Sequence, residues 1–184
     1  MNMFILDSDP KLAAEYHCNK HVVKMVLESA QMLCSAHWFS LLNEHGKKLS
    51  DFKGSRKAKD WLAQNSSPQK VPPYSFTHTG HPCTVWTAKN MGNYDWHVNF
   101  LRCLLDEYTL RYKKQHKCEA VWQWLNSSRP THLDPSMQVT DFPQAMPAEC
   151  KVPGDPVQAY RNYYSQHKRR FAKWEPLSKT PYWF

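Results

Sequence analysis

The sequence predicts an all-α fold, a single-domain helical bundle built around a long N-terminal helix. Apolar residues recur at helical spacing along much of the chain, and two segments open with the Asp-Pro pair that starts many helices, at Asp9-Pro10 and Asp155-Pro156. Only 5 glycines stand against 13 prolines, which indicates defined elements joined by stiff loops. The 184 residues suffice for one hydrophobic core, and no repeat or boundary is visible, so residues 1–184 are predicted as one domain.

The first helix is predicted to be the longest element, beginning at Pro10 and running to residue 37 or as far as residue 46. Apolar positions cover about two thirds of its circumference, which is typical of a helix at the centre of a fold. The residues before it, 1–6, are predicted as a short strand or an extended arm.

Shorter helices are predicted along the rest of the chain from helical spacing and proline positions. They cover residues 55–65, a segment opening at Pro82, residues 94–114, a short segment around residues 121–125, and residues 156–174. Residues 129–154 are Pro-rich and too long for a passive connection, so we expect an ordered loop at an active or binding site. The aromatic tail, residues 181–184, is expected to dock on the body.

Charge and cysteine usage narrow the functional classes. The formal net charge of +8 favours an anionic partner, with nucleic acid first. The 6 cysteines occur without a visible secretory signal, and no apolar run approaches the roughly 20 residues of a membrane span. We therefore expect reduced thiols, no membrane association and a cytoplasmic location, which for a phage protein is the host cytoplasm.

A stripe of polar residues follows one face of the predicted first helix. It consists of His17, His21, Lys24, Glu28 and Gln31, which recur at steps of three and four. A solvated face with an ordinary Lys24–Glu28 pair is one interpretation, but two histidines with a single acid favour a polar cleft. In a cleft, Glu28 would act as general acid or base, Lys24 as nucleophile or phosphate clamp, and His21 as proton shuttle.

Two Cys-x-x-His pairs lie on the same predicted helix, at Cys18–His21 and Cys34–His37. They would be about 24 Å apart along a helix, so they cannot close one tetrahedral site. Buried thiols that serve as small apolar side chains explain them better. The sequence therefore predicts no metal site and no cofactor.

The segment 19–33 resembles the N-terminal motif of the pyrimidine-dimer DNA glycosylase family of phages and bacteria. The residues that match the family's spacing are Lys20, Lys24, Glu28 and Gln31, with His21 where the family prefers arginine. His81-Pro82 followed by Trp86 resembles a second family pattern, one residue shorter. The whole chain also resembles uncharacterised proteins of tailed phages.

The resemblance implies a mostly helical protein that acts on pyrimidine bases of duplex DNA through an amine nucleophile and a carboxylate. It adds Lys20 and His81 to the candidate catalytic residues. The best-known phage member uses a terminal amine freed by removal of methionine. Because Asn2 is too bulky for routine methionine removal, we expect a lysine side chain to supply the amine here.

The last predicted helix combines aromatic and basic residues. The aromatic positions follow helical spacing and are typical of a core stripe, whereas the basic residues occupy the other faces. The basic residues either form a solvated outer face of the helix or contact DNA phosphates. Aromatic packing in the core is compatible with DNA contacts by the basic residues. The expected DNA contacts are Arg161, Lys168, Arg169, Arg170 and Lys173.

Three functions remain open on the sequence. The leading one is glycosylase or glycosylase-like lyase chemistry on pyrimidine bases of DNA, expected to be double-stranded. The second is a transferase that attaches an amino acid or sugar to a modified pyrimidine. The third is a non-catalytic binder of DNA or of another protein, and the sequence also allows an RNA ligand. The chain has no phosphate-binding P-loop, no dinucleotide-binding glycine pattern and no nucleophile elbow, which disfavours nucleotide hydrolysis and esterase chemistry.

Overall fold

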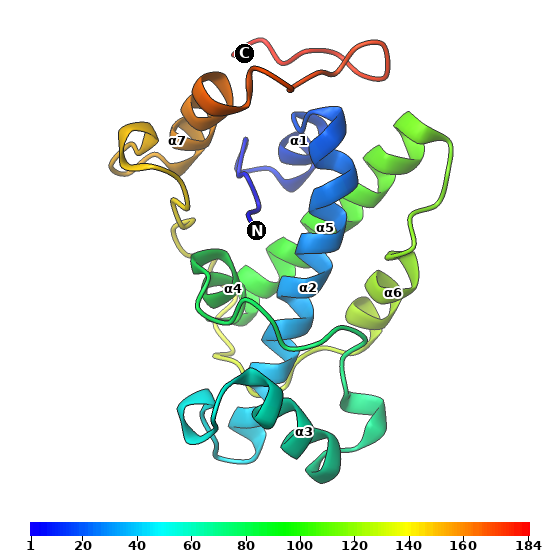
Figure 1. Ribbon diagram of the computed structural model, residues 1–184, viewed down its shortest axis with the longest axis vertical. Coiled ribbons are helices and arrows are strands. Elements are labelled where there is room, and N and C mark those ends of the chain that lie inside the picture. Colours follow the sequence, from blue (N-terminus) through cyan, green and yellow to red (C-terminus); the bar gives the residue numbers. More distant parts are fainter.

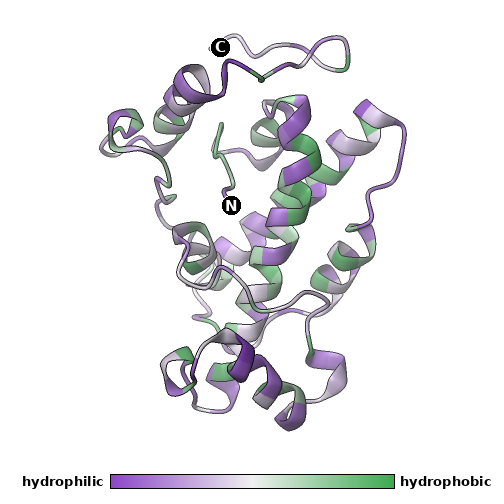
Figure 2. Ribbon diagram, in the orientation of Figure 1, coloured by the Kyte–Doolittle hydropathy of each residue, from purple (hydrophilic) through white to green (hydrophobic).

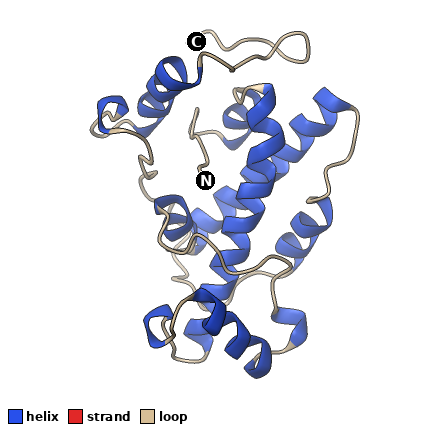
Figure 3. Cartoon of the chain, viewed as in Figure 1, coloured by secondary structure: helices blue, strands red, loops and turns tan.

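The computed structural model describes residues 1–184 and confirms the all-α prediction, because 55% of the chain is helical and no strand is present (Figure 1, Figure 3). The α-helices are α1 (Pro10–Glu15), α2 (Asn19–Glu44), α3 (Ser55–Asn65), α4 (Pro82–Thr87), α5 (Met91–Tyr112), α6 (Glu119–Ser127) and α7 (Pro156–Tyr163). Short 3₁₀ turns lie at Leu49–Asp51, Pro68–Lys70 and Ala148–Cys150, and a π turn at Tyr164–Lys168. None of the helices combines the length and apolarity that a membrane crossing requires.

The main core forms where α2 and α5 cross (Figure 1), and Figure 2 shows apolar residues gathered along both helices there. It contains 30 buried residues, including Met3, Phe4, Ile5 and Leu6. The N-terminal segment is therefore an extended arm, buried between α1 and α7, rather than a strand. A smaller cluster of 6 residues lies under α3, at the far end of α2.

The prediction of a single first helix is wrong, because the segment forms two helices separated by a break at residues 16–18. His17 lies in this break and is fully buried, with its ring nitrogens 2.6 Å from the Ala13 carbonyl and 3.1 Å from the Met3 carbonyl. The backbone N–H of Asn19 donates to the carbonyl of Lys173 at 2.8 Å instead of continuing the helix. Residues distant in the sequence thus form the hydrogen bonds to the backbone that a continuous helix would have formed within itself.

Arg111 on α5 supplies several further interactions at this break. Its guanidinium is completely buried and donates to the carbonyls of Glu15 at 2.8 Å and His17 at 2.7 Å. It also pairs with the Glu107 carboxylate at 2.7 Å and contacts the Asn19 side chain at 3.2 Å. The i,i+4 pair of Glu107 and Arg111 therefore serves the structure: it caps the carbonyl end of α1 and sets where α2 begins.

The Pro-rich loop, residues 129–154, is ordered, as expected, and packs along the start of α5. The backbone N–H of Gly92 donates to the Ser136 carbonyl at 2.9 Å, and the Asn93 side chain accepts from the N–H of Thr140 at 2.8 Å. A Cβ added to Gly92 would lie 2.4 Å from the carbonyl oxygen of Met137. Only glycine allows this close approach of loop and helix.

Several predicted boundaries agree with the structure and two do not. The helix predicted at residues 55–65 is present as α3, and Pro82 opens α4. However, α5 begins three residues before the predicted start, where Asn90 caps it by accepting from the N–H of Asn93 at 2.9 Å. The last helix was predicted to reach residue 174, but α7 ends at Tyr163 and gives way to the π turn. The aromatic tail docks as expected, with the Phe184 ring 4.7 Å from that of Trp174.

Arg111→Met is expected to lower the free energy of unfolding by about 3–5 kcal/mol, because it leaves a buried carboxylate and two carbonyls without their donor. Arg129→Met is the control, since Arg129 pairs with Asp95 at 2.6 Å but is half-exposed, and its loss should stay below about 1 kcal/mol. Urea denaturation followed by circular dichroism measures both. Equal losses would contradict the structural role of Arg111.

Gly92→Ala is expected to destabilise the protein by about 1–3 kcal/mol, because the added methyl meets backbone that cannot rotate away. Gly80→Ala is the matched control, since nothing lies within 4 Å of its added Cβ, and its effect should stay within about 0.5 kcal/mol. Thermal unfolding of both variants tests whether the close contact between Gly92 and the loop stabilises the protein. A neutral Gly92→Ala would show that the loop does not depend on this contact.

Candidate functional site

A cavity of about 330 Å³ lies where the N-terminal arm meets α2 and the segment after α7. The residues that line it are Met1, Asn2, Phe4, His21, Lys24, Met25, Glu28, Tyr163, Lys168 and Phe171. Sequence reasoning had singled out three of the α2 residues and Lys168. The structure thus brings together residues from both ends of the chain around the middle of the predicted polar stripe.

Glu28 is the only carboxylate in this cavity and is 11% exposed. Its Oε2 accepts the backbone N–H of Asn2 at 2.9 Å and lies 3.8 Å from the amine of Met1. Its Oε1 lies 3.2 Å from the Nζ of Lys24. Two amines therefore flank one largely buried carboxylate, with Lys24 itself mostly exposed at the opening.

Asn2 fixes the end of the arm that faces Glu28. Its side-chain amide donates to the carbonyl of Ala145 at 2.7 Å, and its Oδ1 accepts from the N–H groups of Met3 at 2.8 Å and Phe4 at 3.1 Å. The Pro-rich loop therefore reaches the cavity through Ala145. Sequence reasoning missed this role, because the partners of Asn2 are distant in the chain and no local pattern indicates them.

Aromatic rings and a lysine form one wall of the cavity. The ring of Phe4 stacks on His21, with centroids 4.4 Å apart, and on Tyr163 at 5.8 Å. The Nζ of Lys168 lies 4.2 Å from the centroid of Tyr163. Phe4 has a φ of 50°, in the left-handed region that non-glycine residues rarely adopt. Such backbone strain is often held in place at functional sites by surrounding packing.

His21 is a neutral hydrogen-bonding residue rather than a neutral-pH proton shuttle. Burial lowers the pKa of its ring to about 3, helped by the charges of His17, Lys168 and Lys24. Its Nδ1 is hydrogen-bonded to the hydroxyl of Tyr164. The ring therefore stays uncharged near pH 7 and does not supply the positive charge of the arginine that the glycosylase family prefers at this position.

The remaining candidate catalytic residues, Lys20, Gln31 and His81, do not line the cavity. Lys20 is exposed at its rim, with Nζ 5.5 Å from the ring of Phe171. Gln31 is half-buried, and its side chain does not line the cavity. His81 caps α4 by accepting from the N–H of Cys83 at 3.2 Å. Burial and then the charge of the neighbouring terminal amine lower the pKa of His81.

The five predicted DNA-contacting residues divide into two groups. Arg161 is used within the protein, because its guanidinium pairs with Asp7 at 3.1 Å and donates to the carbonyl of Leu6 at 3.0 Å. Lys168 lines the cavity. The exposed ones are Arg169, Arg170 and Lys173. The basic residues at and after the π turn are thus accessible, whereas the one on α7 is not.

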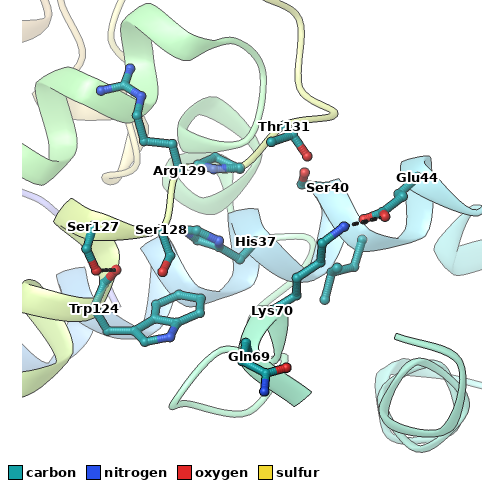
Figure 4. A pocket seen from close by; sticks show the side chains of 12 residues that line it. His37, Ser40, Glu44, Gln69, Lys70, Trp124, Ser127, Ser128, Arg129 and Thr131 are labelled. Atoms are coloured by element: carbon teal, nitrogen blue, oxygen red, sulfur yellow. Dashed lines mark hydrogen bonds and ion pairs between the residues drawn. The ribbon is translucent and has the colours of Figure 1, made fainter. Parts of the chain in front are cut away.

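A second cavity, of about 390 Å³, opens at the other end of α2, and sequence reasoning did not single it out (Figure 4). Its wall includes His37, whose ring packs 4.7 Å from Trp124. Figure 4 shows Lys70 paired with Glu44 across it. The Arg129 side chain in its wall is likewise paired, with Asp95. The Glu44 carboxylate is 27% exposed, against 11% for Glu28, so the amine–carboxylate pair of this cavity is the more solvated of the two.

No protein-family model matches the chain, and neither the curated protein sequences nor the solved structures contain a match. The resemblance of residues 19–33 to the glycosylase family therefore stays a prediction.

The stability of the protein is expected to fall as the pH drops from about 6.5, because four buried histidines fold in the neutral form. Burial is the main cause that lowers the pKa values of His21, His37 and His97 from 6.5 to about 3, and that of His17 to about 4. The unfolded chain binds these protons first, so their stabilisation is present above about pH 6.5 and is lost below it, by up to about 1.4 kcal/mol per pH unit for each ring.

Urea denaturation between about pH 7.5 and about pH 5.5, above the range in which carboxylates titrate, measures this dependence. His97→Gln serves as the comparison and should reduce the slope of stability against pH by about one proton, whatever its effect on stability itself. A stability that does not change over this range would refute the neutral state of the four rings.

Proposed function

We propose that the protein is a DNA-processing enzyme that acts on pyrimidine bases of double-stranded DNA by glycosylase or lyase chemistry. One observation carries the proposal: the Lys24 amine lies 3.2 Å from the largely buried carboxylate of Glu28, in a cavity walled by aromatic rings and a second lysine. An amine paired with a carboxylate is the arrangement that imine-forming catalysis requires. The activity fits a cytoplasmic location, in keeping with six free thiols.

The proposed reaction begins when Glu28 takes a proton from Lys24, which frees the amine. The Nζ of Lys24 then bonds to C1′ of the deoxyribose as the bond from C1′ to the base breaks, and the base leaves with the electron pair and gains a proton. The nitrogen loses a proton as the C1′–O4′ bond opens and O4′ is protonated, which leaves an imine. Water hydrolyses the imine in the glycosylase reaction, or loss of a C2′ proton expels the 3′ phosphate in the lyase reaction.

The surroundings of the two groups suit a nucleotide. The rings of Phe4 and Tyr163 offer flat apolar surface for an extruded base, and Lys168 beside them can pair with a phosphate. The exposed cations Arg169 and Arg170 extend this positive surface, and the formal net charge of +8 favours DNA over neutral substrates. The motif resemblance of residues 19–33 points to the same substrate class.

Borohydride trapping tests the proposal. Duplex oligonucleotides that carry pyrimidine dimers, modified thymines or an abasic site are incubated with protein and reductant, and covalent adducts are counted. We expect an adduct with the wild-type protein, its loss in Lys24→Met and a decrease of at least about 10²-fold in Glu28→Gln. Lys11→Met, which removes an exposed amine on α1, is the control for nonspecific reaction of lysines.

Peptide mapping of the adduct identifies the attacking amine. The Met1 amine, 3.8 Å from the same carboxylate, is the other candidate, and an adduct on residue 1 would overturn the role of Lys24. Mass spectrometry of nucleosides from treated DNA adds a second readout. A base that gains mass without being released would replace the proposal with a base-modifying transferase. If Lys24→Met and Glu28→Gln both act on DNA as the wild-type protein does, the protein is a non-catalytic binder.

A further inference from the structure

Three metal-ligating side chains meet away from the Glu28 cavity, where the end of the Pro-rich loop packs against the chain after α7. Glu149 and Cys150 lie in the 3₁₀ turn Ala148–Cys150, which contacts α7 (Figure 1), and His167 lies in the π turn. One ligand atom from each residue lies within 4.8 Å of the other two. The imidazole Nε2 of His167 is already 3.2 Å from a carboxylate oxygen of Glu149.

We propose that Glu149, Cys150 and His167 bind a zinc-class divalent cation, with a fourth position open to water. Zinc binds thiolate, imidazole and carboxylate ligands in tetrahedral geometry at about 2.0–2.3 Å, which places ligand atoms about 3.3–3.7 Å apart. The present separations, which reach up to 4.8 Å, exceed this by about 1.1–1.5 Å at most. Rotation of the exposed side chains of Glu149 and His167 can close the difference, whereas Cys150 is held in place by burial.

The backbone around the cluster is a second observation in favour of the site. π turns are rare in proteins and occur frequently at functional sites. This one presents two neighbouring side chains to Cys150, because the thiol also donates to the Oε1 of Gln166 at 3.4 Å. The donor set of one thiolate, one imidazole and one carboxylate suits zinc or cobalt better than the hard cations magnesium and calcium.

Binding here would join the loop to the π turn and thereby order part of the Glu28 cavity. Lys168 follows His167 directly, and both Lys168 and Tyr163 line that cavity. The metal would not take part in the chemistry at Glu28, because its ligands do not line that cavity. The site therefore stands or falls independently of the proposed DNA reaction.

Cobalt and zinc titration of tag-free, chelator-treated full-length protein tests the site. Co²⁺ is expected to bind at one equivalent and to give the near-ultraviolet charge-transfer band of a cobalt–thiolate bond, and Zn²⁺ should abolish it. Cys150→Ser should remove the band, and His167→Gln or Glu149→Gln should weaken binding by at least about tenfold. Cys103→Ser, which alters the only thiol that is not buried, is the control and should keep the band.

Zinc is also expected to raise the melting temperature of the wild-type protein but not of Cys150→Ser, and this readout needs no enzymatic activity. Circular dichroism of each variant confirms that it is folded. Absence of a thiolate band, or a band that persists in Cys150→Ser, would overturn the proposal. If zinc binds all variants with equal strength, the binding is adventitious and the proposed site is wrong.

Discussion

The buried guanidinium of Arg111 is the interaction on which the arrangement of the N-terminal third depends. Its hydrogen bonds to the carbonyls of Glu15 and His17 end α1 and allow α2 to start afresh at Asn19. Since an unpaired buried charge is costly, the Glu107 carboxylate beside it is equally necessary. A single side chain on α5 therefore bonds both the end of α1 and the start of α2, the helix that carries Lys24 and Glu28.

The candidate site is assembled from three segments that are far apart in the sequence. The arm contributes Phe4 and a backbone N–H through Asn2, α2 contributes the carboxylate, and the end of α7 with the segment after it contributes Tyr163 and Lys168. The Glu28 carboxylate is held by contacts from the arm and from its own helix, so it is oriented before any substrate arrives. Preorganised polar groups of this kind are what a catalytic carboxylate needs.

The fold class and most helices could be predicted because their signals are local. Ser55–Asn65 and the helix that starts at Pro82 follow from spacing and proline position alone. The break before Asn19 could not, since its causes lie about 90 residues away at Arg111 and more than 150 away at Lys173. Helical spacing likewise placed His21, Lys24 and Glu28 together, but it could not indicate that His17 leaves the helix or that Asn2 meets Glu28. The role of Arg161 was also hidden, because a basic residue on a predicted helix face gives no sign of a buried partner such as Asp7.

The hydrogen bond between Asn2 and Ala145 gives the Pro-rich loop a significance that its composition hides. The composition of residues 129–154 is that of an ordinary surface loop. However, the loop connects the first turn of α5 to Asn2, the residue that orients Glu28. Most residues of this loop are exposed, so tolerance to sequence change should be low only where the loop is anchored, as at Thr140 and Ala145. In a library of random variants, inactivating changes would mark these anchor positions, although no sequence motif distinguishes them from the exposed residues between them.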